Sequence, residues 1–425
     1  MNRTVRCILC LAIPQVLCFA VTPACLSFTG WSGQVNPQAD TAGLANVHYP
    51  EASNTTYFVA AFHQNAGDVV TIRGRYPFAR FMSLEIYPSV TVSYINDSNI
   101  APDPGQNNPF VSGTDHGTYT AYLVFGPQPD LPAQNTLYAG TQTDVVLAYR
   151  VYHTTDPNDP AGGVPEPRLW MNGQQLDNCP VQPVIQPTTS TPWGRLDQGN
   201  WIGAPPTPAQ QLAASYFPKW FLLSAAETAG GFSNGANYYL QARLSRQYLA
   251  PNTSRDIFVL RFKAPTYPNT RKGEPAYLRH QVRFWSVCTN DNYTTNVVRC
   301  VPDDSIVLDA NGYAVIVVSD PGSKPSAAAL ARYRATWLAW GALALPTDVV
   351  FDDHQAAWGT NTPVHFYSTV MFRQTLANSA FTQSFAAVFA LPLSQQQAAM
   401  GAYWPVSGYC SSAGFESYGI YCLNH

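Results

Sequence analysis

The sequence contains few charged residues and no cluster of positive charge. Only 12% of its 425 residues are Asp, Glu, Lys or Arg, which is about half the usual share, and the formal net charge is −3. The scarcity of Lys and Glu argues against long solvated helices. The absence of a Lys/Arg run argues against a nucleic acid partner. After residue 24, no apolar run is long enough for a transmembrane helix.

Sequence patterns that bind metals are also missing. The eight histidines form neither H-x-H nor H-E-x-x-H, and no C-x-x-C follows the N-terminal segment. These spacings are typical of zinc sites, so we expect neither a metal nor a cofactor. Loops 156–159 and 290–296 carry oxygen ligands that calcium could use. Neither has a recognisable ligand spacing, and Asx turns explain them equally well.

The N-terminal segment has the order of a secretory signal peptide. Two arginines precede an apolar stretch over Cys7–Val21, and small residues follow at 22–24. We therefore expect residues 1–24 to be removed and the mature chain to be periplasmic or secreted. The alternatives are a membrane anchor and lipid attachment at Cys25. The apolar stretch is shorter than the ~20 residues that a span needs, and the residues before Cys25 match a lipobox poorly.

Six cysteines follow residue 24, and an even number in an exported chain favours disulfides. Two pairs are close in the sequence, and we predict both as disulfides: Cys288–Cys300 and Cys410–Cys422. The remaining two, Cys25 and Cys179, would pair by elimination, although six cysteines allow many other connectivities.

The strongest internal signal is a duplication. Asp68–Pro77 (DVVTIRGRYP) aligns without a gap with Asp256–Pro265 (DIFVLRFKAP). Other matching blocks keep the same order: YFVAA from Tyr57 with YYLQA from Tyr238, RFMS from Arg80 with RFWS from Arg283, APD from Ala101 with VPD from Val301, and VLAYR ending at Arg150 with TVMFR ending at Arg373. The drift in spacing indicates insertions in the second copy, as loops tolerate.

The repeated blocks have the pattern of β-strands. In Arg80–Tyr87 apolar Met82, Leu84 and Ile86 alternate with residues that point to the other side, and turn-rich stretches separate such blocks. We therefore predict a mainly β fold with two related antiparallel domains, each a sandwich or barrel-like, and a few short helices.

The expected domain organisation follows from the repeats. The predicted segments are a first β domain at 25–185, a linker with a helix at 186–232, and a second β domain at 233–425 with C-terminal helices and a disulfide-closed tail. Helices are expected over Thr207–Leu223, Ser326–Trp340 and Asn378–Phe389, and from Ser394.

These blocks resemble a group of uncharacterised bacterial exported proteins. The matching stretches include RYPFARFMSLEIY (75–87), YRVYHTTDPNDPAGGVPEPRL (149–169) and RFWSVCTND (283–291). The first half is also distantly similar to the β-rich families called domains of unknown function 1254 and 1214. The resemblance implies export and a β-rich fold, and it supplies no catalytic residue.

Arginines inside apolar strands are the candidate ligand-binding residues. Three in the first copy have counterparts in the second: Arg73, Arg80 and Arg150, with Arg261, Arg283 and Arg373. A buried arginine needs a carboxylate, and the candidate partners are Asp68, Glu85, Asp103, Asp256 and Asp303. Such arginines could bind an anionic or sugar ligand. Because they recur in both copies, we favour structural ion pairs or solvent-facing strand ends.

Two short patterns suggest catalysis. Ser233 lies in GFSNG, which fits the nucleophile elbow G-x-S-x-G. The elbow needs a strand before it and a helix after it, and the order expected here is reversed, so a glycine-rich turn is the simpler interpretation. Asp353 and His354 could serve acid–base chemistry. Neighbouring strand residues point to opposite faces, so polar surface explains this pair equally well.

The sequence therefore predicts an exported protein that binds a small molecule, a glycan or an envelope component, with the space between the two domains as the expected location. The alternatives are a periplasmic or secreted hydrolase and an envelope structural or assembly protein.

Overall fold

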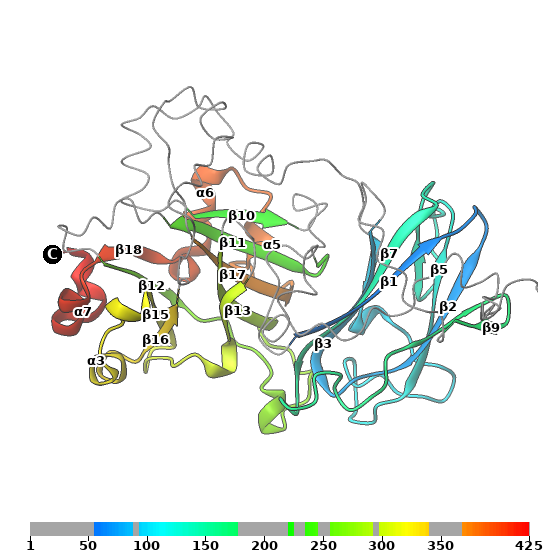
Figure 1. Ribbon diagram of the computed structural model, residues 1–425, viewed down its shortest axis with the longest axis horizontal. Coiled ribbons are helices and arrows are strands. Elements are labelled where there is room, and N and C mark those ends of the chain that lie inside the picture. The colour runs from blue at the N-terminus through cyan, green and yellow to red at the C-terminus, as the bar shows by residue number, and fades with distance from the viewer. Residues whose placement is uncertain are drawn as a thin grey trace, which may run out of the picture.

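The computed structural model shows two β domains that lie side by side (Figure 1). We call them the N-terminal domain, blue to cyan-green in the figure, and the C-terminal domain, green to red. Each contains two sheets and the helices are short, so the prediction of a mainly β fold with few helices is confirmed. The structure describes residues 55–87, 93–176, 220–224, 234–244, 256–291, 297–339 and 368–424.

The N-terminal domain encloses one apolar core between its two sheets. The first sheet has the order β1 (Thr55–His63), β7 (Asp144–Thr154), β3 (Ala79–Tyr87), β4 (Ser93–Asn96). The second has the order β6 (Thr136–Tyr138), β5 (Thr118–Val124), β2 (Val69–Arg75), β8 (Arg168–Met171), β9 (Gln174–Gln175). Alternate side chains point inward, as Val70 and Ile72 of β2 and Leu84 of β3 do.

The C-terminal domain has the same layered construction. One sheet has the order β10 (Trp220–Ser224), β11 (Asn237–Leu244), β17 (Ser368–Ala377), β13 (Val282–Asp291), β14 (Val297–Pro302). The other has the order β16 (Ala335–Ala339), β15 (Tyr313–Ser319), β12 (Ile257–Lys263), β18 (Val406–Cys410). Trp285, Phe372 and Phe262 pack edge to face or tilted between the sheets.

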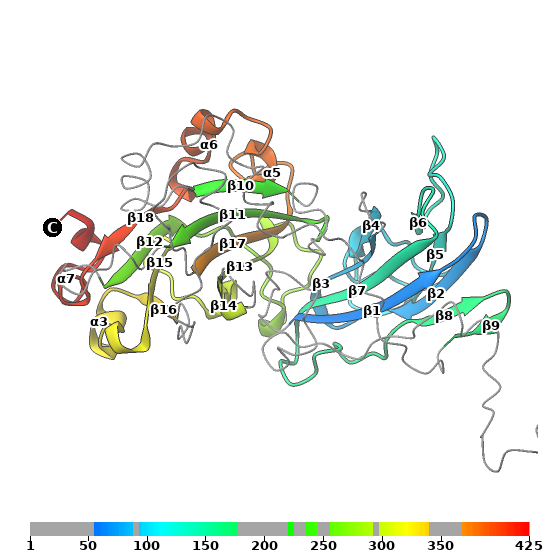
Figure 2. The ribbon, with the colours of Figure 1, turned by 45° about the horizontal axis from the view of Figure 1, so that its top comes forward.

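Short helices flank the C-terminal domain (Figure 2). The α-helices are α3 (Ala327–Arg332), α5 (Phe385–Val388), α6 (Leu393–Met400) and α7 (Ser412–Tyr418). The described 3-10 segments are short and follow strands or helices: η3 (Asp97–Asn99), η5 (Thr270–Lys272), η6 (Asp303–Ser305), η7 (Pro321–Ser323), η8 (Gly401–Tyr403) and η9 (Gly419–Asn424).

The two domains share one topology, which confirms the predicted duplication. The order β1-β7-β3-β4 matches β11-β17-β13-β14, and β6-β5-β2-β8 matches β16-β15-β12-β18. Within the described strands the exceptions to antiparallel pairing also match, because β5 with β6 and β15 with β16 are both parallel. The turns η3 and η6 follow the equivalent strands β4 and β14. Strands β9 and β10 are additions specific to one copy.

Backbone strain recurs at equivalent positions of the two copies. His153 near the end of β7 and Leu376 near the end of β17 have φ angles of 53° and 47°. Asn135 before β6 and Arg334 before β16 have φ angles of 56° and 50°. Left-handed backbone is uncommon for residues other than glycine. Its recurrence in pairs therefore shows that the duplication extends to local backbone geometry.

Strand pairing corrects two of the sequence alignments. Tyr57 lies opposite Arg150, whereas Tyr239 lies opposite Arg373, so the counterpart of Tyr57 is Tyr239 and not Tyr238. A one-residue shift of this kind would exchange the two faces of a strand. The match of APD with VPD is also wrong, because Asp303 at the start of η6 corresponds to Asp97 at the start of η3.

Three of the four expected helices differ from the structure. Trp220–Leu223, the described end of the first, belongs to strand β10, which pairs with β11. Short apolar runs fit either a strand or a helix, and here the neighbouring strand decides. The second expected helix ends early at α3 and its remainder forms β16, while the third is confined to α5. The helix expected from Ser394 is present as α6.

Both sequence-near disulfides are present, Cys288–Cys300 between β13 and β14 and Cys410–Cys422 in the C-terminal tail. The other two predicted disulfide cysteines, Cys25 and Cys179, lie outside the described part of the chain, as do the catalytic candidates Ser233, Asp353 and His354. Among the described helices, none combines the length and the apolar character that crossing a membrane requires.

Candidate functional site

Arg73 and Arg261 lie on the outer faces of equivalent strands. Arg73 is exposed and its guanidinium lies 5.3 Å from the Trp170 ring. Arg261 is partly exposed, pairs with Asp309 at 3.4 Å and covers the Tyr313 ring at 3.7 Å. The structure thus places this pair at the surface and away from the contact between the domains.

The arginines at the second position of β3 and of β13 reach from one domain to the other. The Arg80 guanidinium of the N-terminal domain is ion-paired with Asp303, and both side chains are fully buried. Arg283 of the C-terminal domain donates to both carboxylate oxygens of Asp97 at 3.2 Å, and Asp97 is also fully buried. Each domain therefore supplies one arginine and one aspartate to the other.

Backbone donors hold both carboxylates in the same way. The Met82 N–H donates to Asp97 at 3.1 Å, and the Trp285 N–H donates to Asp303 at 3.0 Å. Met82 and Trp285 each follow the bridging arginine by two residues. Equivalent residues thus make equivalent contacts on both sides, which is the arrangement of a two-fold symmetric interface between identical units.

An aromatic cluster surrounds the two bridges. Its buried members come from both domains: Tyr57, Phe81, Tyr152, Ala236 and Phe284. Tyr152 packs edge to face on Phe81 at 5.3 Å and on Phe284 at 6.0 Å. The Arg80 guanidinium also lies 4.8 Å from the Tyr267 ring. Apolar rings thus exclude water from the bridges, which strengthens the electrostatic attraction within them.

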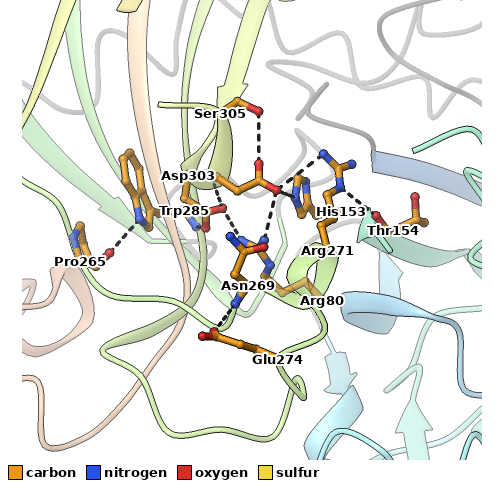
Figure 3. A network of polar contacts seen from close by, with 11 residues as sticks. Arg80, His153, Thr154, Pro265, Asn269, Arg271, Glu274, Trp285, Asp303 and Ser305 are labelled. Carbon is orange, nitrogen blue, oxygen red and sulfur yellow. Dashed lines mark hydrogen bonds and ion pairs between the residues drawn. The ribbon is translucent and has the colours of Figure 1, made fainter. Parts of the chain in front are cut away.

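The symmetry breaks around Asp303, where three further polar residues gather (Figure 3). His153 Nε2 lies 2.8 Å from Asp304 Oδ2, and Arg80 Nη2 lies 3.6 Å from the same oxygen. Arg271 Nη1 lies 3.7 Å from Asp304, and its Nε donates to the Thr154 carbonyl at 3.1 Å. At the other bridge, the positions of His153 and Asp304 are taken by Leu376 and Ser98.

Burial and the hydrogen bond between His153 and Asp304 shift the pKa values of these two residues in opposite directions. Burial lowers the pKa of His153, and Arg80 adds to that effect, whereas the hydrogen bond with Asp304 opposes it. Burial also acts to raise the pKa of Asp304, but the hydrogen bond with His153 and the charges of Arg80 and Arg271 outweigh it and lower this pKa to about 2. Asp304 is therefore ionised and His153 neutral near pH 7.

The cluster has the residue types of a metal site but not the charge balance of one. Ligand atoms of His153, Asp303 and Asp304 lie within 4.8 Å of one another. The guanidinium groups of Arg80 and Arg271 already neutralise the two carboxylates. A divalent cation would add two uncompensated charges to a buried site, which is costly. The donor set therefore fits a salt-bridge network and not a metal centre.

A cleft of about 110 Å³ opens beside this network. Its lining comes from both domains, with Phe78, Phe110, His116 and Thr155 on one side and Thr270 and Glu274 on the other. The second group belongs to the β12–β13 loop (residues 264–281). The equivalent connection in the N-terminal domain, between β2 and β3, consists only of residues 76–78. The cleft thus exists because of an insertion in the second copy.

The β12–β13 loop is anchored on both domains. Ala276 joins the apolar core of the N-terminal domain, and Tyr267 packs on the core of its own domain. Arg271 fixes the loop to the buried network through Thr154 and Asp304. One wall of the cleft is therefore held by the same contacts that join the two domains.

The cleft combines a flat aromatic wall with an exposed carboxylate, and a buried hydroxyl lies beside it. Phe78 is 46% exposed and stacks on the His116 ring with centroids 3.6 Å apart. Burial lowers the pKa of His116, so this ring is neutral near pH 7. Glu274 is exposed and accepts the Asn269 N–H at 2.6 Å. The Thr270 hydroxyl is buried and has no hydrogen-bond partner among the described residues.

The last pair of arginines has diverged between the copies. Arg150 Nη1 binds Glu85 Oε1 at 2.9 Å, and Glu85 also accepts the Gly235 N–H of the C-terminal domain at 3.1 Å. Arg373 contacts Cys288, which takes the position of Glu85 in the second copy. A buried ion pair in one domain thus corresponds to a disulfide in the other.

Sequence reasoning identified Glu85 and Asp303 as carboxylate partners but missed the other polar residues of the interface: Asp97, His153, Arg271 and Asp304. A sequence signal for one of them, Asp97, exists. Asp97 and Asp303 both follow a short strand that comes after the RF-x-S block, so an alignment on that block would have paired them.

Comparison with known proteins adds little to this picture. No family model and no curated protein matches the chain. The crystal structure of an uncharacterised protein from Burkholderia cenocepacia is similar with a TM-score of 0.47 and 14% identity, over 91% of this chain and 83% of that one. Vicilin from Capsicum annuum gives a TM-score of 0.13 and 10% identity, over 84% and 90% of the two chains. Neither similarity supports a functional inference.

Proposed function

We propose that the chain is an exported protein that binds a sugar unit of a glycan, or a polar molecule of similar size, in the cleft between its two domains. Export is supported by the N-terminal sequence pattern and is compatible with the two disulfides. Binding clefts occur preferentially at domain interfaces, which is where this one lies.

The observation that carries the proposal is the position of the cleft within the duplicated architecture. The two arginine–aspartate bridges between the domains are equivalent, whereas the β12–β13 loop has no counterpart of similar length in the N-terminal domain. That loop supplies Thr270 and Glu274 to the cleft. An insertion that only strengthened the contact would have no need to leave an open space lined by polar groups and an exposed aromatic ring.

The chemistry of the lining fits a sugar. A sugar ring has an apolar face that packs on an aromatic side chain such as Phe78, and hydroxyl groups at its edge. The Glu274 carboxylate can accept hydrogen bonds from those hydroxyls. His116, which also lines the cleft, stacks on the Phe78 ring.

Binding is favoured over hydrolysis by the number of carboxylates. Glycosidases generally use two carboxyl groups that flank the scissile bond, whereas Glu274 is the one carboxylate among the described residues that line the cleft. The predicted catalytic candidates Ser233, Asp353 and His354 lie outside the described residues and do not bear on this choice.

The test is a glycan array probed with the purified mature protein, followed by calorimetry with the strongest binder. We expect Phe78→Ala to weaken binding by about tenfold or more, because an aromatic contact contributes roughly 1.5–3 kcal/mol, and Glu274→Gln to weaken it as well. Tyr421→Ala is the control, because Tyr421 is an exposed aromatic residue of the C-terminal tail. Unchanged affinity in both cleft variants, or no glycan bound, would reject the proposal and favour a structural or assembly role.

A further inference from the structure

His153 is a titratable side chain sealed inside the contact between the domains. It belongs to β7 of the N-terminal domain, is fully buried, and binds Asp304 of the C-terminal domain. Its Nδ1 atom is buried and has no hydrogen-bond partner among the described residues. A proton added to the ring would therefore place a new N–H where no described acceptor is available.

Charged groups and an aromatic ring from four elements lie around His153. Asp303 and Asp304 approach from η6, Arg80 from β3 and Arg271 from η5, and the Phe284 ring of β13 lies 5.6 Å away. With a neutral histidine, two guanidinium groups balance two carboxylates. Protonation would leave three cations against two anions in a largely buried site, where solvent screens charges weakly.

We propose that His153 makes the contact between the two domains acid-sensitive, so that protonation of its ring separates the domains locally and releases the β12–β13 loop. The opposite bridge serves as the internal comparison, because Leu376 and Ser98 cannot titrate there. The effect on a bound sugar is the one part of this inference that rests on the proposed function. Release of the loop would remove the wall that carries Thr270 and Glu274.

The direction of the pH effect follows from the burial of the imidazole. An exposed histidine has a pKa near 6.5, and burial lowers this pKa in the closed state. The open state therefore binds the proton more tightly. The stability of the closed state is fully present above about pH 6.5 and decreases as the pH falls below that value, by up to about tenfold in the opening constant per pH unit.

The experiment measures how often the interface opens. Ala236 is buried in the aromatic cluster between the domains, so the thiol of an Ala236→Cys variant reacts with a dipyridyl disulfide only when the domains separate. Labelling rates are compared at pH 7.5, 6.5 and 5.5 in the His153 and His153→Gln backgrounds. The ratio of the two rates at one pH cancels the intrinsic reactivity of the thiol. Glutamine keeps a donor for Asp304 and does not titrate.

The inference predicts that this ratio rises between pH 7.5 and pH 5.5, by up to about tenfold. A ratio that stays constant would overturn it. His153→Leu, which copies the residue at position 376, gives a second background with the same expectation. The measurement needs no ligand, so its outcome is independent of sugar binding.

Discussion

Arg80 and Arg283 occupy the same position in the two domains, and each binds a buried aspartate of the other domain. Because the two aspartates are equivalent as well, the duplicated chain contacts itself as two identical subunits would. The cleft and the His153 network lie on the one side of this interface where the second copy has gained a loop.

Breaking the buried ion pair of Arg150 and Glu85 should lower stability far more than breaking the partly exposed pair of Arg261 and Asp309. We expect Arg150→Met to lower the free energy of unfolding by about 3–5 kcal/mol, because Glu85 would remain buried without its partner. Arg261→Met, which removes a partly exposed pair with Asp309, should cost about 1 kcal/mol or less. Urea unfolding of both variants measures the difference, and similar costs would contradict it.

Asp304 should add to the acid sensitivity at lower pH. Its pKa is lowered from 3.8 to about 2, so its contribution to stability is present above its ordinary pKa and lost as the pH falls from there through about 2. Asp304→Asn should abolish this part of the pH dependence while lowering stability at pH 6. Unfolding free energies at pH 6, 4 and 2.5 provide the test. A variant with the same loss between pH 4 and 2.5 as the parent chain would contradict it.

The tail disulfide should be needed for stability in an oxidising compartment. Cys410 and Cys422 are separated by 12 residues, and a cross-link of this span typically contributes about 2–4 kcal/mol. We expect Cys410→Ser/Cys422→Ser to lower the melting temperature. Peptide mapping without reduction should recover the intact link in the parent chain, and free thiols at both positions would contradict the assignment.

Gly162 should be required for the aromatic wall of the cleft. Its φ angle is +74°, its carbonyl accepts the Phe78 N–H at 2.7 Å, and an added Cβ would lie 2.9 Å from Pro77. Gly140 has a similar φ of +66° and open space around it. We expect Gly140→Ala to cost about 1 kcal/mol from backbone strain alone, and Gly162→Ala about 1–3 kcal/mol more from the clash. Equal costs in thermal unfolding would show that the clash is absent.

The sequence was sufficient to predict the duplication, the mainly β fold and two disulfides, because repeated blocks, alternating strand patterns and cysteine spacing are visible in it. Register was harder to predict. Tyr57 is followed by an aromatic residue, and Tyr238 and Tyr239 are both aromatic, so the sequence allows Tyr57 to align with either of them. The strand pairing decides, because Tyr57 lies opposite Arg150 and Tyr239 lies opposite the equivalent Arg373. Strand β10 could not be separated from a helix, because its short apolar run gains its identity from β11.

The candidate site was predicted in part. Arginines in apolar strands indicated buried ion pairs, and Arg80, Arg150 and Arg283 form such pairs with Asp303, Glu85 and Asp97. The partners across the interface could not be assigned, because no sequence pattern orients one domain on another. His153 was missed for the same reason, since its importance depends on Asp304 of the other domain.

The most direct test of the account is a double-mutant cycle across the domain interface with Arg80→Ala, Asp303→Ala and the double variant. Bridged, buried partners should show a coupling energy of about 1–3 kcal/mol in unfolding, and the equivalent cycle with Arg283 and Asp97 should show coupling of similar size. Additive effects, with coupling below about 0.5 kcal/mol in both cycles, would mean that the domains are not joined by reciprocal bridges and would contradict the account.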